Sequence, residues 1–281
     1  MVADPTSAHD RVAILISVHR AADVTHFELA LQSLRDQTYR EIETWLFVDG
    51  PVLPGHEAAI ERHFQAMPGG RVLRSAVSVG LPAALNRLID DALGTASITL
   101  LARMDADDVC MPKRLQRQVE TMLTRADIDV LGTWCIEFTE PDIPTFHKQL
   151  PVDPEAVRDF MIYRSPLAHP TVMFRRHVLD AGHRYNPSYL QMQDYELWAR
   201  LVVAGVRIGN VPEYLLWFRM AENFFFRRTG WQRAWREAHL RYRYAKQAHL
   251  LRPLHLLGLF TLLLVRIAPV WLKRFAYRKL R

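Results

Sequence analysis

The stretch Ile98-Thr-Leu-Leu-Ala-Arg-Met-Asp105-Ala-Asp107-Asp108 decides the predicted fold. It begins as an apolar run, which is typical of a buried strand in a parallel sheet. Three carboxylates stand at the exit of that strand, and Pro112 fits the start of a helix predicted from Lys113 to about Thr124. Ligands of open α/β sheets bind outside the carboxyl ends of the strands, so this acidic strand end is a candidate ligand site.

The acidic cluster favours a divalent cation. Asp105 and Asp107 are two residues apart, so in an extended chain their side chains point to the same side. Carboxylates this close repel one another unless protons or a cation neutralise them. Mg²⁺ takes oxygen ligands and commonly binds through one or two carboxylates together with substrate phosphates. A solvated acidic turn that only caps the next helix is the alternative interpretation.

Strand and helix patterns alternate four times in the first 125 residues. This alternation predicts βαβ units, and hence an α/β fold with a mostly parallel central sheet flanked by helices. The expected strands are 11–18, 43–48, 72–77, 128–138 and 169–174, and the expected helices are 27–37, 58–67, one from residue 80, 153–163 and 195–203. Neither G-x-G-x-x-G nor G-x-x-x-x-G-K-[ST] occurs, so bound phosphates would be held by a metal ion rather than by a glycine-rich loop.

Charge is unevenly distributed along the 281 residues. The net charge is +6, yet ten Lys or Arg and no Asp or Glu follow Leu240, which leaves 26 basic against 30 acidic residues in positions 1–240. A mildly acidic body argues against a nucleic-acid-binding domain, in which the basic patch belongs to the fold. The basic C-terminal tail suggests an anionic surface as its partner instead.

The C-terminal tail also contains an apolar stretch, 254–265, that is shorter than the ~20 residues of a membrane span. Basic and aromatic residues at 271–281 favour the lipid headgroup region. We therefore expect peripheral attachment to the inner face of the cell membrane, with a helix packed on the catalytic body as the alternative. The chain has only Cys110 and Cys135, and residues 1–10 lack a signal-peptide core, which suits a cytoplasmic protein.

Seven pieces of the sequence follow one another in a defined order. They are AILISVHR (13–20), LQSLRDQTYREIETWLFVDG (31–50), VGLPAALNRLID (79–90), ARMDADDVCMPKRLQRQ (102–118), HPTVMFRR (169–176), QDYELWARL (193–201) and VPEYLLWFR (211–219). In this order they resemble the family 2 glycosyltransferases of the GT-A fold, in particular the bacterial surface-polysaccharide enzymes. The resemblance implies a GT-A domain over 1–220, with a nucleotide-sugar half at about 1–108 and an acceptor half at 109–220. A basic, aromatic helical tail follows over 221–281.

The resemblance implies an inverting transfer of a sugar from a nucleotide-sugar, most often a UDP-sugar, to a hydroxyl of a glycan or lipid-linked acceptor. By match to the family's motifs, Asp49 would bind the uracil, and Asp194 would be the catalytic base. Asp105 and Asp107 would hold Mg²⁺ or Mn²⁺ on the diphosphate. This division is chemically reasonable, because a metal stabilises the leaving diphosphate while a separate base takes the acceptor proton.

Two positions depart from the family's pattern. Its Glu-Asp pair reads Gln193-Asp194 here, so the first carboxylate is missing while the base is retained. A glutamine still hydrogen-bonds an acceptor, which places Gln193 on the acceptor side. The Tyr-Arg-x-His segment of the family reads Phe218-Arg219-Met220-Ala221 and keeps only the arginine.

Five further candidates come from their positions along the expected elements. Ser17 and His19 end the first strand at the nucleotide edge, and Asn86 lies on the polar side of its helix. Arg103 is unusual in a core strand and would pair with the acidic cluster or with a phosphate. His169 would line the acceptor site or be satisfied within the sheet. Each of these residues also fits an ordinary structural role.

Two rival functions fit parts of the sequence. A nucleotidyltransferase also uses paired carboxylates and a metal, but it needs a glycine-rich basic loop after the first strand, and residues 19–22 (HRAA) match that poorly. A non-catalytic scaffold at the membrane surface would explain the missing Glu at position 193. Metal-dependent hydrolysis of a UDP-sugar discriminates between enzyme and scaffold, because a scaffold shows none.

Overall fold

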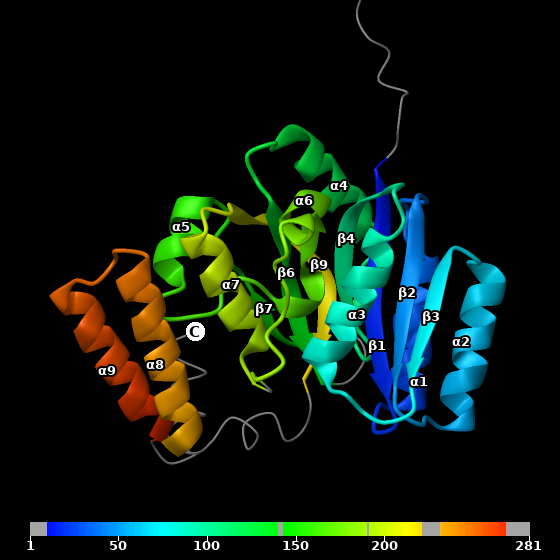
Figure 1. Cartoon of the computed structure of the whole chain (residues 1–281), viewed down its shortest axis with the longest axis horizontal. Helices are drawn as coiled ribbons and strands as arrows, with labels where there is room; N and C mark the ends of the chain where they lie inside the picture. Colours follow the sequence, from blue (N-terminus) through cyan, green and yellow to red (C-terminus); the bar gives the residue numbers. More distant parts are fainter. Residues whose placement is uncertain (1–9, 140–142, 190, 221–230, 268–281) are drawn as a thin grey trace, which may run out of the picture.

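One sheet runs through the body of the protein in the computed structural model, which describes residues 10–139, 143–189, 191–220 and 231–267 (Figure 1). The first half comprises β1 (Arg11–His19), α1 (Val24–Arg35), β2 (Ile42–Asp49), α2 (Pro54–Ala66), β3 (Gly70–Ser75), α3 (Leu81–Leu93) and β4 (Ile98–Asp105). The second half comprises β5 (Val109–Cys110), α4 (Arg114–Thr124), β6 (Val130–Phe138), β7 (Pro144–Lys148), α5 (Pro154–Phe160), β8 (Met173–Arg175), α6 (Arg176–Asp180), α7 (Gln193–Val203) and β9 (Ile208–Arg219). Two helices, α8 (Trp231–Gln247) and α9 (Pro253–Ile267), form a hairpin at one end of the molecule.

The strand order of the sheet is β3-β2-β1-β4-β8-β6-β9-β5, and β7 pairs with β6. The four strands from β3 to β4 are parallel. Beyond β4 the sheet is mixed, because β8 is antiparallel to both β4 and β6, whereas β6 and β9 are parallel. The α/β fold is thus confirmed, and the expected parallel order describes the first half.

Both faces of β1 are covered by helices. Val12, Ile14 and Ile16 belong to one core cluster with α1, α2 and α4, whereas Ala13 and Leu15 belong to a second cluster with α3 and α7. Successive side chains of a strand point to opposite faces, so a strand covered on both sides must be apolar at every position. This explains the continuous apolar run from which the strand was predicted.

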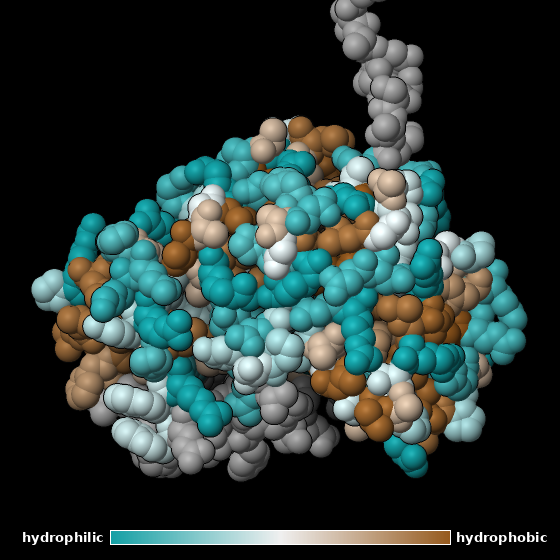
Figure 2. Space-filling model, viewed as in Figure 1, coloured by the Kyte–Doolittle hydropathy of each residue, from teal (hydrophilic) through white to brown (hydrophobic). Residues whose placement is uncertain are grey.

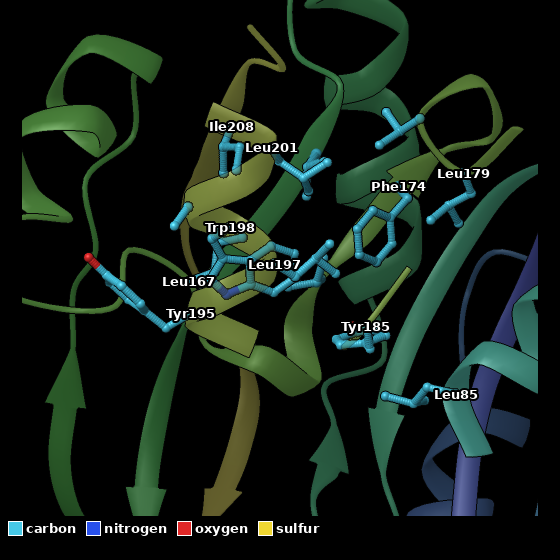
Figure 3. Close-up of a cluster of buried hydrophobic side chains, with 14 of the residues drawn as sticks. Leu85, Leu167, Phe174, Leu179, Tyr185, Tyr195, Leu197, Trp198, Leu201 and Ile208 are labelled. Carbon is cyan, nitrogen blue, oxygen red and sulfur yellow. The ribbon is translucent and has the colours of Figure 1, made fainter. Parts of the chain in front are cut away.

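The second cluster extends to α7. Trp198 of α7 lies close to Phe174 of β8, with 5.8 Å between their ring centroids, and Leu197 and Leu201 surround them (Figure 3). The helix that was expected at 195–203 is therefore fixed against the sheet by large buried side chains. Its position relative to the end of β4 decides the geometry of the candidate site.

Several expected elements differ in the structure. Residues 169–171 form a 3-10 turn, and only Met173 and Phe174 of the expected strand belong to β8. Pro112 precedes α4 in a turn, because the helix begins at Arg114. The short strands β5 and β7, the helix α6 and the long strand β9 were not anticipated. Most of these lie in the antiparallel half, where the strand–helix alternation stops.

Helices α8 and α9 pack on the body. Tyr244 of α8 donates a hydrogen bond to the carbonyl of Arg158 at 2.8 Å, and Gly258 of α9 lies against Tyr163 so closely that a Cβ would approach its ring to 2.4 Å. The described part of the predicted tail thus follows the alternative expectation of a packed helix, while residues 268–281 lie outside the described residues. Within the described ranges, no helix combines the length and apolar character that a membrane crossing requires.

Candidate active site

Three parallel strand ends bring predicted nucleotide-side residues to one edge of the sheet. The register of β1 and β4 sets Ser17 beside Asp105, and the register of β1 and β2 sets His19 beside Asp49. Neighbouring strands lie about 4.8 Å apart, so these four residues span a short length of this edge. His19 is exposed, and its Nδ1 accepts a hydrogen bond from the backbone N–H of Ala21 at 3.1 Å, which orients the ring.

The acidic triplet is a true cluster in space. Ligand oxygens of Asp105, Asp107 and Asp108 all lie within 4.8 Å of one another. Desolvation by the surrounding protein, and then the charge of Asp105, raise the pKa of Asp107 to about 6. Burial, and then both neighbouring carboxylates, raise the pKa of Asp108 well above its usual value. Three carboxylates held this closely are destabilised in their charged form unless a cation neutralises them.

Asp108 provides the clearest test of whether a cation fits. Its Oδ1 accepts a hydrogen bond from the backbone N–H of Arg219 at 2.7 Å. Its Oδ2 is buried and has no hydrogen-bond partner among the described residues. A buried carboxylate oxygen without a donor, next to two further carboxylates, suits a hard divalent cation. The donor set therefore fits Mg²⁺ or Mn²⁺.

Arg103 lies beneath this cluster at the end of β4. Its side chain is 2% exposed and forms an ion pair with Asp105. Its Nε and Nη1 are buried without a hydrogen-bond partner in the described part of the chain. The expected pairing of Arg103 with the acidic cluster is thus present, and two further donors of its guanidinium remain unsatisfied. Buried donors of this kind are costly unless a ligand completes them.

Asp49 is held by the turn between β3 and α3. Its carboxylate accepts hydrogen bonds from the Ser78 hydroxyl at 2.8 Å, the backbone N–H of Val79 at 2.6 Å and that of Gly80 at 3.1 Å. Gly50, which follows it, has φ +81°, and a Cβ there would lie 3.1 Å from the nitrogen of Ser78. The carboxylate and the glycine together fix the turn that faces the end of β2, and the predicted uracil contact of Asp49 stays a prediction.

Asn86 and His169 converge on Tyr185, which the sequence did not single out. The amide of Asn86 donates to the carbonyl of Tyr185 at 2.8 Å and accepts from its backbone N–H at 2.9 Å. The Tyr185 hydroxyl lies 2.8 Å from Nε2 of His169. Enclosure of the ring, and then the charge of Arg103, lower the pKa of His169 well below its usual value, so the ring is neutral. The structure gives Asn86 and His169 a part in fixing Tyr185, and their predicted ligand contacts stay predictions.

Helix α7 begins at Gln193, two residues earlier than expected. Met192, with φ +61°, is the residue before the first turn, so Asp194 lies within that turn rather than capping it. Asp194 is half-buried, and within the described part of the chain its carboxylate accepts no hydrogen bond. A carboxylate in the first helical turn is favoured by the helix dipole. The carboxylate is thus free to accept a hydrogen bond from an approaching hydroxyl.

Tyr185 connects the two acidic groups. Burial raises the pKa of Tyr185, the charge of Arg103 opposes that rise, and the charges of Asp194 and Asp105 add to it. Both carboxylates are thus close enough to act on Tyr185 electrostatically, although 89 residues separate them in the sequence. Figure 3 shows Tyr185 between α7 and the strand end near α3. The fold thus brings Asp105 and Asp194, which are far apart in the sequence, into the surroundings of one tyrosine.

Four residues of the site were missed or undervalued. Tyr185 lies in a loop without a pattern, so no signal in one sequence could have found it. Ser78 precedes the Gly80 turn, and the burial of Asp108 within the triplet cannot be read from spacing. Arg219 had a signal, since it is the residue kept from the family's Tyr-Arg-x-His segment, and its Nε donates to the carbonyl of Asp107 at 2.8 Å.

The comparisons with known sequences agree on one family. A sequence model described as glycosyl transferase family 2 matches residues 14–184. The chain is 30% identical to the amylovoran biosynthesis glycosyltransferase AmsE of Erwinia amylovora, covering 95% of this chain and 98% of that one. It is 23% identical to the UDP-Gal:alpha-D-GlcNAc-diphosphoundecaprenol beta-1,3-galactosyltransferase of Escherichia coli, covering 96% of each.

Solved structures agree on the fold. The chain is similar to S. aureus TarS 1–349 in complex with UDP, with a TM-score of 0.63 at 14% identity over 85% of this chain and 69% of that one. It is also similar to the mannosyltransferase PcManGT from Pyrobaculum calidifontis in complex with GDP-Man and Mn²⁺, with a TM-score of 0.61 at 16% identity over 99% and 82%. These likenesses support the GT-A fold, and the nucleotidyltransferase alternative finds no support.

Proposed function

We propose that this chain, which belongs to glycosyl transferase family 2, transfers a sugar from a UDP-sugar, with inversion, to a hydroxyl of a glycan or lipid-linked acceptor in surface polysaccharide synthesis. The observation that carries the proposal is the acidic cluster at the end of β4, where a buried oxygen of Asp108 has no partner among the described residues, together with Asp194 in the first turn of α7. An inverting displacement needs a neutralised leaving group on one face of the sugar and a base on the other.

The donor would lie along the carboxyl edge of β1, β2 and β4. Asp49, Ser17 and His19 line the part of this edge assigned to the nucleoside. Asp105 and Asp107, with the unsatisfied oxygen of Asp108, would hold Mg²⁺ or Mn²⁺, which supplies charge neutralisation to the diphosphate. The free guanidinium donors of Arg103 lie beneath the same cluster and would meet phosphate oxygens.

The acceptor would approach from α7. Asp194, half-buried and without a hydrogen bond from the described residues, takes the proton from the attacking hydroxyl. Gln193, one residue earlier, hydrogen-bonds the acceptor in place of the carboxylate that the family shows there. Three hydrogen bonds, two with Asn86 and one with His169, hold Tyr185, so its side chain would give the reaction partners a fixed surface. Rigid positioning of this kind favours a near-attack geometry.

The acceptor class and the place of action follow from the relatives and the charge pattern. The Escherichia coli relative is named for a sugar-diphosphoundecaprenol acceptor, which is a lipid-linked sugar. The basic C-terminal region has the charge that an anionic cytoplasmic leaflet attracts. We therefore assign the protein to the inner face of the cell membrane, with a lipid-linked sugar as its acceptor and no nucleic-acid partner.

The experiment is a donor screen followed by a transfer assay. Thermal unfolding is measured with UDP-sugars, GDP-mannose and free UDP, each with Mn²⁺ and with EDTA. A UDP-sugar should stabilise the protein only with the metal, and the stabilising donor should then be transferred to a short-chain lipid-diphosphate sugar with inversion at the anomeric carbon. Stabilisation by no nucleotide-sugar, or UDP binding that is indifferent to EDTA, would contradict the proposal.

A further inference from the structure

Helix α8 has two faces of different character. Its inner face carries Glu237, Leu240, Arg241 and Tyr244, which are all buried against the body of the protein. Its outer face carries Trp231, which is 58% exposed, and two further aromatic residues of the same stripe. The buried inner face holds α8 against the body of the protein. The outer face has no partner among the described residues.

The outer stripe is aromatic. Trp231, Trp235 and Tyr242 are separated by four and seven residues, so they lie on one side of the helix. Trp235 and Tyr242 are 56% and 40% exposed. The rings of Trp231 and Trp235 stack with 6.3 Å between centroids. Tryptophan is rarely left in water at such exposure, and a stacked pair on a helix surface marks an interaction site.

The charged residues beside this stripe are all basic. Arg236, Arg243 and Lys246 are exposed, and none of the ion pairs in the described part of the chain includes them. Glu237 is the one acidic residue after position 230, and it is buried in a pair with Arg241. The outer face therefore presents tryptophan, tyrosine and positive charge together, which is the composition of the membrane–water interface.

Helix α9 extends the apolar surface of the hairpin. Leu256, Leu257 and Phe260 are exposed, whereas Leu259 is buried and Gly258 packs on Tyr163. Part of the apolar stretch that the sequence assigned to the membrane thus faces the body instead. Figure 2 shows hydrophobic residues at the edge of the molecule formed by the two helices, interspersed with hydrophilic ones. The exposed apolar side chains at this edge could insert a short way into a lipid bilayer.

We propose that the outer face of α8, defined by Trp231, Trp235, Tyr242, Arg243 and Lys246, is an interfacial binding surface for an anionic lipid bilayer. The helix lies in the headgroup region with its tryptophans inserted, while the exposed residues of α9 contact the same bilayer. The reason for docking rests on the proposed function, because a lipid-linked acceptor would bring the enzyme to the bilayer. The binding surface itself does not depend on that function. A second copy of the chain would leave the positive charges facing one another, which favours lipid over self-association.

The test uses the full chain and vesicles of two compositions, phosphatidylcholine alone and equal parts of phosphatidylcholine and phosphatidylglycerol. Wild type should co-sediment with the anionic vesicles at low salt and be released by high salt. Arg243→Gln/Lys246→Gln should weaken binding roughly 30-fold, because each basic residue at an anionic surface contributes about fivefold. Trp231→Ser/Trp235→Ser should weaken vesicle binding at least about tenfold, because the apolar contribution is lost. The binding that remains should be electrostatic and should disappear at high salt.

Matched controls separate this surface from general effects. Leu123→Ser removes an apolar residue of α4 that is even more exposed than the tryptophans, and Arg62→Gln removes an exposed arginine from α2. Both should bind vesicles like wild type. The paired tryptophan variant should keep the thermal stabilisation by UDP and Mn²⁺, because its residues lie outside the candidate active site. If UDP and Mn²⁺ stabilised neither wild type nor any variant, the proposed function would be wrong, but the vesicle-binding result would still stand.

Two outcomes would overturn the membrane surface. One is unchanged vesicle binding in the tryptophan pair or the basic pair. The other is that wild type elutes as a dimer, the tryptophan pair as a monomer, and neither sediments with anionic vesicles. The second result would reassign the outer face of α8 to contact between copies of the chain.

Discussion

The guanidinium carbon of Arg241 lies 4.5 Å from the ring centroid of Tyr195, and Tyr195 directly follows Asp194 in the first turn of α7. The same guanidinium pairs with Glu237 at 2.9 Å and donates to the carbonyl of Met161 at 3.2 Å. Both partners of the ion pair are buried. Helix α8 therefore packs on the first turn of α7, which carries Asp194, the base that we propose.

Removing Arg241 should be costly for stability. Arg241→Ala takes the cation out of a buried ion pair, which typically destabilises a protein by about 3–5 kcal/mol. Glu237→Leu/Arg241→Leu removes both charges and should recover most of that loss, because no buried charge remains uncompensated. Urea unfolding of wild type, single and double variants measures the difference. A double variant no more stable than the single one would show that the pair is not the source of the effect.

The acidic cluster should make nucleotide binding depend on metal. Asp107→Asn removes one proposed ligand without changing side-chain size, and we expect Mn²⁺ affinity in the presence of UDP to fall at least tenfold, since even outer-sphere partners of a metal cost that much. Calorimetric titration of Mn²⁺ into protein in the presence of UDP, with UDP alone as the blank, measures it. Asp180→Asn, on the exposed side of α6, is the control. Unchanged affinity in Asp107→Asn would remove Asp107 from the ligand set.

Sequence reasoning succeeded where both faces of a strand are buried. The runs at 11–18 and 98–102 are mostly apolar because helices cover both faces of the sheet, so both strands were predicted, the first to within a residue. It failed beyond β4, where short antiparallel strands alternate with turns. The stretch at 169–174 reads as a strand, but Pro170 lies in a 3-10 turn that removes the first three residues from the sheet.

The residues of the candidate site likewise fall into those that the sequence could place and those that it could not. Residues that follow a buried strand, such as Asp49 and Asp105, could be placed at one edge because parallel strands end together. Tyr185 could not, because its position depends on hydrogen bonds to Asn86, 99 residues away. The inner and outer faces of α8 were also hidden, since the basic and aromatic residues after position 230 show periodicity but not which face meets the body.

A buried histidine should make stability depend on pH. His63 is fully buried, and its Nε2 lies 3.0 Å from the Thr44 hydroxyl. Burial, and then the charge of Arg35, lower the pKa of His63 to about 4, whereas the unfolded chain has about 6.5. Between these values the unfolded chain binds a proton that the native protein does not, so this residue should cost about 3 kcal/mol of stability as the pH falls from 6.5 to 4.

The comparison of His63→Gln with wild type isolates this contribution. Glutamine keeps a hydrogen-bonding group near Thr44 but does not titrate, so its unfolding free energy should fall less steeply over the same pH range. His147→Gln changes an exposed histidine and should retain the wild-type slope. Parallel slopes in His63→Gln and wild type would mean that other groups carry the acid sensitivity.

The last prediction separates the base from its neighbour. Asp194→Asn keeps the shape of the side chain but cannot accept the acceptor's proton, and general-base catalysis contributes about 10²–10⁴-fold. We therefore expect kcat to fall at least about 100-fold while UDP affinity with Mn²⁺ stays near wild type. Gln193→Ala removes only a hydrogen bond to the acceptor, so it should raise the KM for the acceptor and change kcat much less. Steady-state kinetics against acceptor concentration distinguish the two. Equal loss of kcat in both variants would mean that the first turn of α7, rather than the Asp194 carboxylate, is what the reaction requires.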